Sequence, residues 1–364
     1  MGEIRLPTAT DRNETLLANM PTPRQAICSA AAACLGAFAM YKTQAVTKEY
    51  MDPIVAFCSN PSSSSFAVPG VTFVPHEPLT GLVVFAPLVC IITQFLNSLV
   101  TNHPEGMITW GSTMISCLPA LLVMTIEGGR SGSRGIVRYP TVLGLLGQIL
   151  GISVAFPLFW VPGCLLLSSG PARGGATLSR RAYAGLVLAI PCIACTAFAF
   201  VLDPSSRPWR VFVGMLGGPI LPMLSLVLWG MEVPNDKRSD PQVVADGAVA
   251  SQRAYLAVGA VGLGWWWAII VPKILGVYGL DPVVIWSAIW TAAHPSVKFM
   301  TIDAVVLWLG MVMYIAAEDL FGAFVALVTA PLLGPGASCV VALWGREKMR
   351  EAVAKKAVVH KKAE

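Results

Sequence analysis

The sequence predicts an all-α fold, a polytopic bundle of transmembrane helices. Three features of the composition predict it: 55% of the residues are hydrophobic, only 12% are charged, and the mean hydropathy is +0.67. An ordinary soluble domain carries about a quarter charged residues. Several apolar runs reach the roughly 20 residues that a helix needs to cross a bilayer, and none alternates as the strands of a membrane barrel do.

Hydropathy predicts nine membrane spans. They cover residues 26–41, 79–100, 107–126, 141–167, 182–202, 209–231, 254–276, 300–317 and 320–344. The first span is short and rich in alanine, so eight spans is the alternative. The apolar run 282–295 is too short to cross and predicts an interfacial or re-entrant piece. The chain thus divides into a polar segment (1–25), a transmembrane domain (26–344) and a basic tail (345–364).

The distribution of charge predicts the orientation. The net charge is +5 and its excess lies in the tail, which predicts a cytoplasmic C-terminus and does not point to nucleic acid binding. Nine spans would then place the N-terminus in the lumen and expose the sequon at Asn13 to glycosylation, whereas eight would leave Asn13 unmodified. Eight of the nine cysteines lie in apolar runs, so we expect no disulfide framework.

Two acidic residues are the candidates for chemistry. Glu127 ends the third predicted span, and Asp303 lies in the apolar run "FMTIDAVVLWLG" of the eighth. Ionisable groups inside a membrane are costly and indicate a functional site by default. The predicted topology puts both acids at a similar depth, where two carboxyl groups in a dry cavity would leave one protonated and able to act as an acid. For Glu127, pairing with an arginine of the following loop is the alternative; Glu318 and Asp319 are expected in a solvated turn.

Aromatic residues and helix breakers suggest an internal chamber. Trp265, Trp266 and Trp267 lie in mid-span rather than at an interface, and an apolar cavity with aromatic walls suits a cation. Lipid packing is the alternative for any single tryptophan. Proline and glycine interrupt several spans, as they do around cavities and in transporters. The sequence contains no Walker loop, Asp-rich cluster or HExxH helix, so we expect neither a metal nor another cofactor.

The segment 126–163, "IEGGRSGSRGIVRYPTVLGLLGQILGISVAFPLFWVPG", resembles the fungal integral-membrane terpene cyclases of meroterpenoid pathways. The likeness is to the ascochlorin and ascofuranone branch and to related membrane proteins of indole-diterpene clusters. The residues that carry it are Glu127, Arg130 with Gly132, Tyr139-Pro140-Thr141, Gln148 and Pro157-Leu158-Phe159. A second likeness is Asp303 near the start of a late span.

This resemblance implies metal-independent cyclisation of a prenylated small molecule in the endoplasmic reticulum membrane, beside other membrane-bound biosynthetic enzymes. An intramembrane acid would protonate a terminal epoxide or alkene, with Glu127 and Asp303 as acid and partner. Arg130, Tyr139 and Gln148 would support the site; the mid-span aromatic residues, and not the resemblance, add Trp266 as a substrate contact. The "EGG" after the acid and the tryptophan-rich span depart from the family pattern and leave the substrate open. A small-molecule transporter and a non-catalytic scaffold remain alternatives.

Overall fold

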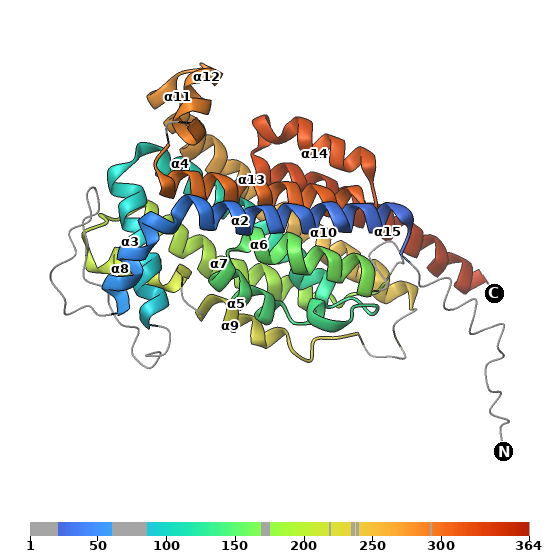
Figure 1. Cartoon of the computed structure of the whole chain (residues 1–364). Coiled ribbons are helices and arrows are strands. Elements are labelled where there is room, and N and C mark those ends of the chain that lie inside the picture. The colour runs from blue at the N-terminus through green and yellow to red at the C-terminus, as the bar shows by residue number, and fades with distance from the viewer. Residues whose placement is uncertain are drawn as a thin grey trace.

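The computed structural model describes residues 21–59, 86–168, 175–217, 220–233, 237, 240–291 and 293–363. All regular secondary structure in these residues is helical. Most of the helices lie side by side in an elongated bundle, and the end of the last helix extends beyond it (Figure 1). The sequon at Asn13 lies outside the described residues, as does most of the polar N-terminal segment.

In the first half of the chain, the described residues form ten helical elements. They are α2 (Pro23–Ser59), α3 (Ala86–Asn102), α4 (Pro104–Gly128), η2 (Gly135–Arg138), α5 (Pro140–Leu150), α6 (Ile152–Ala155), the π-helical turns η3 (Phe156–Trp160) and η4 (Gly163–Leu167), α7 (Ser179–Val201) and α8 (Arg207–Gly217). The second half follows the same all-helical pattern. It contains α9 (Ile220–Leu224), η6 (Ser225–Leu228), α10 (Pro241–Trp265), η8 (Trp266–Ile270), α11 (Val271–Tyr278), α12 (Pro282–Trp286), η9 (Ser287–Thr291), α13 (Pro295–Ala316), α14 (Leu320–Leu333) and α15 (Pro335–Ala363).

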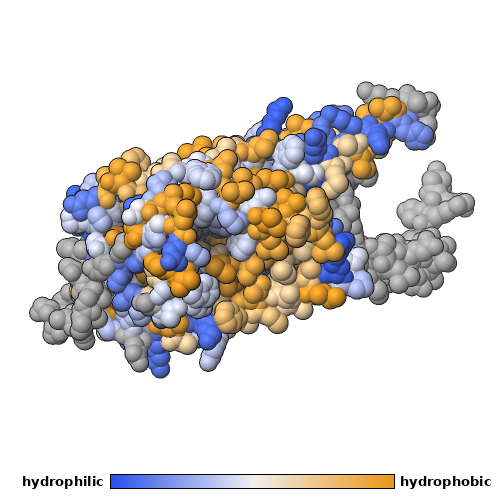
Figure 2. Space-filling model, turned by 90° about the horizontal axis from the view of Figure 1, so that it is seen from above, coloured by the Kyte–Doolittle hydropathy of each residue, from blue (hydrophilic) through white to orange (hydrophobic). Residues whose placement is uncertain are grey.

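Within the described residues, five helices are long and apolar enough to span a membrane. They cover residues 23–46, 105–128, 179–201, 241–278 and 295–316. A sixth span results if the pair 207–217 and 220–228, which is bent by 57°, is counted as one. Hydrophobic residues occupy the middle of the molecular surface and hydrophilic ones gather toward its ends (Figure 2). The chain thus has the helices of a membrane protein, whereas the predicted count of eight to nine spans is not confirmed.

Two predicted spans are broken at a glycine with positive φ. Gly151, with φ of +92°, separates α5 from α6 inside the predicted span 141–167. Gly334, with φ of +80°, separates α14 from α15 inside the predicted span 320–344. Residues with a side chain rarely adopt this conformation, so both breaks require glycine. Hydropathy does not detect such a break because the flanking residues remain apolar.

The core forms around α10, α13 and α15. Helix α15 packs along α10, and α13 packs against both α2 and α4. Small residues allow this close packing: a Cβ atom on Gly259 of α10 would lie 2.8 Å from Val340 of α15. The predicted tail begins inside α15, which continues as a helix to Ala363. The boundary predicted at residue 345 is therefore not a structural break.

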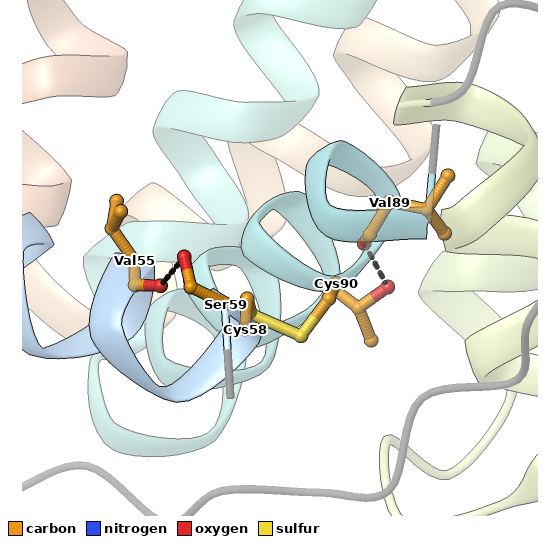
Figure 3. The surroundings of a disulfide bond; sticks show 6 residues. Val55, Cys58, Ser59, Val89 and Cys90 are labelled. Carbon is orange, nitrogen blue, oxygen red and sulfur yellow. Dashed lines mark hydrogen bonds between the residues drawn. A yellow bond between two sulfur atoms is a disulfide. The ribbon is translucent and has the colours of Figure 1, made fainter. Parts of the chain in front are cut away.

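A disulfide joins Cys58, near the end of α2, to Cys90, the fifth residue of α3, with 5.7 Å between their Cα atoms (Figure 3). The expectation of no disulfide is wrong for this pair. Both cysteines were interpreted from their sequence neighbours, and hydropathy says nothing about which residues meet in space. The other seven cysteines are free thiols.

Candidate functional site

Glu127 lies near the C-terminal end of α4 in a buried group of charges. Its carboxylate accepts hydrogen bonds from Arg130 Nε at 2.7 Å and from Arg346 Nη2 at 2.6 Å. Glu127 as a whole is only 2% exposed. Both carboxylate oxygens are therefore held by guanidinium groups, one from the loop after α4 and one from α15.

A second buried acid, Glu347 on α15, completes the connection. It accepts hydrogen bonds from Arg130 Nη2 at 2.6 Å and from Arg350 Nη1 at 2.7 Å, and Arg346 Nη2 lies 3.0 Å away. Burial opposes charge on this carboxyl, but Arg130, Arg350 and Arg346 together lower its pKa. Glu347 is thus an ionised partner of three arginines, of which Arg346 and Arg350 belong to the predicted basic tail and Arg130 to the loop after α4.

Glu318 is a third acid of the group, and its environment differs from that expected for a solvated turn. Its side chain is 8% exposed, and its Oε2 atom lies 3.5 Å from Arg346 and 3.7 Å from Arg350. Burial raises its pKa, and the two arginines only partly offset that effect. Its Oε1 atom has no hydrogen-bond partner among the described residues.

These side chains form what we call the ion cluster. Its members are the carboxylates of Glu127, Glu318 and Glu347 and the guanidinium groups of Arg130, Arg346 and Arg350. The cluster is balanced in charge, and it joins α4, the turn between α13 and α14, and α15. Such a buried set is stable only while each charge keeps its partners. The alternative interpretation of Glu127, a structural ion pair with a loop arginine, describes its contacts.

The two glycines after Glu127 make room for a buried arginine. Arg181 of α7 is 1% exposed and donates hydrogen bonds to the carbonyl oxygens of Thr125 at 2.8 Å and Leu228 at 3.1 Å. A Cβ atom on Gly128 would overlap the Val137 carbonyl oxygen and lie 3.1 Å from Arg181 Nη2, and one on Gly129 would overlap the Arg181 side chain. Arg181 therefore binds the Thr125 carbonyl in the last turn of α4, where a cation is favoured.

Asp303 has very different surroundings. It lies on α13, is 7% exposed, and accepts a hydrogen bond from the Ser153 hydroxyl. A Cβ atom on Gly151 would lie 3.4 Å from its Oδ1 atom, so the carboxyl group faces the break between α5 and α6. No lysine, arginine or histidine among the described residues lies within ion-pair distance of it. Lys298, the basic residue nearest in sequence, makes no such pair.

The structure does not bring Glu127 and Asp303 together. Helices α4 and α13 run in the same direction: Thr113 of α4 donates to the Met300 carbonyl, and Arg346 bridges Glu127 to the Tyr314 hydroxyl. The eleven residues from Asp303 to Tyr314 correspond to about 16 Å of helix. The expectation of a shared pocket is wrong. The expectation assumed that the chain reverses its direction at each predicted span. The breaks within predicted spans change the number of crossings, and so change the end of the bundle at which α13 begins.

A cavity of about 200 Å³ lies between α4, α11, η9 and α13. Its aromatic wall consists of Trp266, Tyr278 and Trp308. None of its lining residues is charged. Residues 301, 304, 305 and 308 of α13 face it, which is one side of that helix, and Asp303 lies on another.

Comparison with known sequence families adds one finding. Residues 52–200 match the CtvD domain. This family is linked to fungal secondary-metabolite biosynthesis. The match covers less than half of the chain, and no curated protein or solved structure matches it.

The CtvD match includes four of the predicted site residues, Glu127, Arg130, Tyr139 and Gln148, and ends before Asp303 and Trp266. The Gln148 side chain donates to the Leu216 carbonyl at 3.1 Å, and Tyr139 is 39% exposed and packs edge-on against Trp229. Neither contacts Glu127 or Asp303. The structure thus joins only Arg130 to Glu127, and it places Trp266 at the cavity.

Little in the described residues, the ion cluster included, suits a metal ion. No group of three or more histidine, cysteine, aspartate or glutamate side chains there is placed to hold an ion. The chemistry that the buried carboxyl group of Asp303 can provide by itself is the donation of a proton.

Proposed function

We propose that this protein is a membrane-bound cyclase of secondary metabolism that protonates an apolar, prenylated substrate without a metal ion, and that Asp303 is the proton donor. The observation that carries the proposal is a buried carboxyl group with a hydroxyl partner and no cation among the described residues. An ionised carboxylate there would lack a counter-charge, whereas a protonated acid needs none. The CtvD match supports the biosynthetic setting.

In this mechanism Asp303 gives its proton to a terminal epoxide or alkene, and the resulting carbocation closes rings. The reaction is an isomerisation, because a final deprotonation returns one proton. After transfer, the Asp303 carboxylate keeps the Ser153 hydrogen bond and lies beside Gly151, before the helical segment 152–167. The start of a helix favours a negative charge.

Glu127 takes a different role in the revised proposal. Two guanidinium groups hold it, and charge-assisted bonds of this kind favour the ionised form of a carboxyl group. It is therefore a structural residue that joins α4 to α15, and Arg130 acts with it rather than on the substrate.

A proton-coupled transporter is the second candidate. The observation that favours it is the helix break at Gly151 beside the buried acid Asp303, since transporters place acids at broken helices. The two candidates differ in what they release: a cyclase yields a rearranged molecule, and a transporter yields the unaltered one on the other side.

We propose that the protein lies in the endoplasmic reticulum membrane and that its chain crosses this membrane several times. Disulfides persist in oxidising compartments, so the Cys58–Cys90 end would face the lumen. Tyr50 contacts His294, which stacks on His103, so the end of α2 and the starts of α4 and α13 lie at this end. The ion cluster lies at the opposite end and would face the cytosol. Helix α2 then begins on the cytosolic side, which agrees with an unmodified Asn13.

An assay with microsomes and an epoxy-farnesyl aromatic substrate tests the proposal. We expect Asp303→Asn, at a normal protein level, to lose cyclised product by about 100-fold or more, the usual contribution of a positioned acid. Ser153→Ala should reduce the rate less. Normal turnover by Asp303→Asn would refute Asp303 as the acid, and transport of unaltered substrate by the native protein would favour the transporter.

A further inference from the structure

The cavity between α4, α11, η9 and α13 has two polar groups without a hydrogen-bond partner among the described residues, the Tyr278 hydroxyl and the Trp308 indole N–H. Two other hydroxyl residues of its lining are bound within their own helices: Ser112 donates to the Ile108 carbonyl at 2.8 Å, and Thr301 donates to the Val297 carbonyl at 2.9 Å. The indole N–H of Trp266 donates to the Pro331 carbonyl at 3.2 Å.

Trp308 differs from these residues. It lines the cavity, and its indole Nε1 atom is buried without a hydrogen-bond partner among the described residues. Buried donors in native proteins are nearly always satisfied by protein, water or ligand. An orphan donor on a residue that lines an apolar cavity therefore indicates a ligand that supplies an acceptor.

We propose that this cavity binds the oxygen-bearing end of an uncharged, apolar molecule, and that the Trp308 indole N–H donates to an ether, epoxide or carbonyl oxygen of that molecule. Charged groups such as a diphosphate are excluded, because no lining residue carries a charge that could pair with them. A volume of about 200 Å³ holds a segment about as large as six or seven waters, not a whole prenylated compound.

The claim that this molecule is the cyclase substrate rests on the proposed function. The claim that the cavity binds an uncharged, oxygen-bearing molecule does not. Since Asp303 lies on another side of α13, the oxygen held by Trp308 is not the one that receives the proton. The cavity is then a subsite for the unreacting, oxygen-bearing part of the substrate.

Helices α11 and α12 form one wall of this subsite and project from the bundle (Figure 1). They are joined at Gly279, whose φ is +64°, and Leu280 beside it is 84% exposed. An apolar hairpin of this kind can lie against lipid. An apolar ligand would thus reach the cavity from the bilayer.

Equilibrium binding to the full-length protein in lipid nanodiscs tests this inference. The probes are tritiated farnesyl methyl ether, which carries one acceptor, farnesene, which carries none, and farnesyl diphosphate, which is charged. We expect the native protein to bind the ether about 3- to 10-fold more tightly than the hydrocarbon, the value of one hydrogen bond, and to bind the diphosphate weakly.

Variants assign that preference to one atom. Trp308→Phe keeps an aromatic wall but removes this donor, so it should bind the ether and the hydrocarbon equally, whereas Tyr278→Phe, which removes the other unpartnered donor, should keep the preference. Trp267→Phe is the matched control and should keep the preference, since its N–H already donates to the Leu332 carbonyl at 2.8 Å and its side chain is not part of the cavity lining. Ala304→Phe should fill the cavity and weaken both apolar probes.

Equal binding of ether and hydrocarbon by the native protein would overturn the inference, as would an unchanged preference in Trp308→Phe. The experiment is independent of turnover: Asp303→Asn should bind all probes like the native protein. Lost binding with intact cyclisation would refute the subsite alone, and intact binding with no cyclisation by the native protein would refute the cyclase alone.

Discussion

Replacing Glu127 by glutamine tests the ion cluster directly. The native carboxylate neutralises part of the charge of Arg130 and Arg346 at 2.7 and 2.6 Å in a site that is 2% exposed. The amide keeps the shape but removes the charge, which leaves three guanidinium groups facing two carboxylates. Loss of one partner from a buried ion pair typically costs about 3–5 kcal/mol.

We therefore expect Glu127→Gln to lower the free energy of unfolding by about 3–5 kcal/mol, measured by SDS titration in mixed micelles. Glu351→Gln is the matched control. Its partner Lys355, on the same helix, is 65% exposed in its side chain, so this change should cost less than about 1 kcal/mol.

A double-mutant cycle separates charge balance from other effects. Adding Arg346→Gln to Glu127→Gln restores equal numbers of each charge, so the double variant should cost less than the two single changes together, by about 0.5–3 kcal/mol. Additive costs would refute the argument that balance stabilises the cluster. A Glu127→Gln protein as stable as the native one but without cyclised product would refute the structural role, because it would make Glu127 the acid.

Three further predictions follow from the fold. Arg181→Leu should strongly lower the midpoint of thermal unfolding, because the Thr125 and Leu228 carbonyls lose their buried donor, whereas the exposed Arg180→Leu should change it little; equal effects would contradict this role of Arg181. Burial and His103 lower the pKa of His294 to about 4, so unfolded chains bind a proton there below about pH 6.5 while the folded protein does not. The neutral His294 therefore contributes fully to the free energy of unfolding above about pH 6.5, and this contribution is lost as the pH falls toward 4. His294→Gln should flatten this part of the plot of unfolding free energy against pH. An unchanged slope would contradict the prediction. In sealed microsomes, a membrane-impermeant maleimide should label Cys58 and Cys90 only after reduction and permeabilisation, and endoglycosidase should not shift the protein; labelling of reduced, sealed vesicles would reverse the proposed orientation.

The helical class and the membrane character of the protein could be predicted from composition alone, because helices that span a membrane strongly raise the mean hydropathy of the chain. The number of crossings could not. Gly151 and Gly334 interrupt runs that remain apolar on both sides, and their positive φ angles, not their hydropathy, end the helices.

The two acids were correctly singled out as buried: Glu127 is 2% exposed and Asp303 7%. The proximity of the two acids was inferred by assuming that successive spans cross the membrane in alternating directions. Each miscounted span between them therefore moved Asp303 to the other end of the bundle in the prediction. Their partners were missed for another reason. Arg346 and Glu347 lie 219 and 220 residues after Glu127, and no local pattern of the basic tail distinguishes them from solvated charges.

Arg181 shows what a sequence motif can reveal after the structure is known. A side chain at Gly129 would overlap Arg181, and one at Gly128 would meet the Val137 carbonyl oxygen first and Arg181 next. Adjacent glycines at a helix terminus thus indicate that something bulky approaches, without indicating what.

The ion cluster also has a consequence for biogenesis. During synthesis the ribosome delivers Glu127, Arg130 and Glu318 to the membrane first, with one negative charge in excess, and only α15 brings the compensating Arg346, Glu347 and Arg350. The nascent chain therefore lacks one compensating positive charge at this end of the bundle until its final helix emerges. Quality control could distinguish a truncated copy from a finished one by that single uncompensated charge.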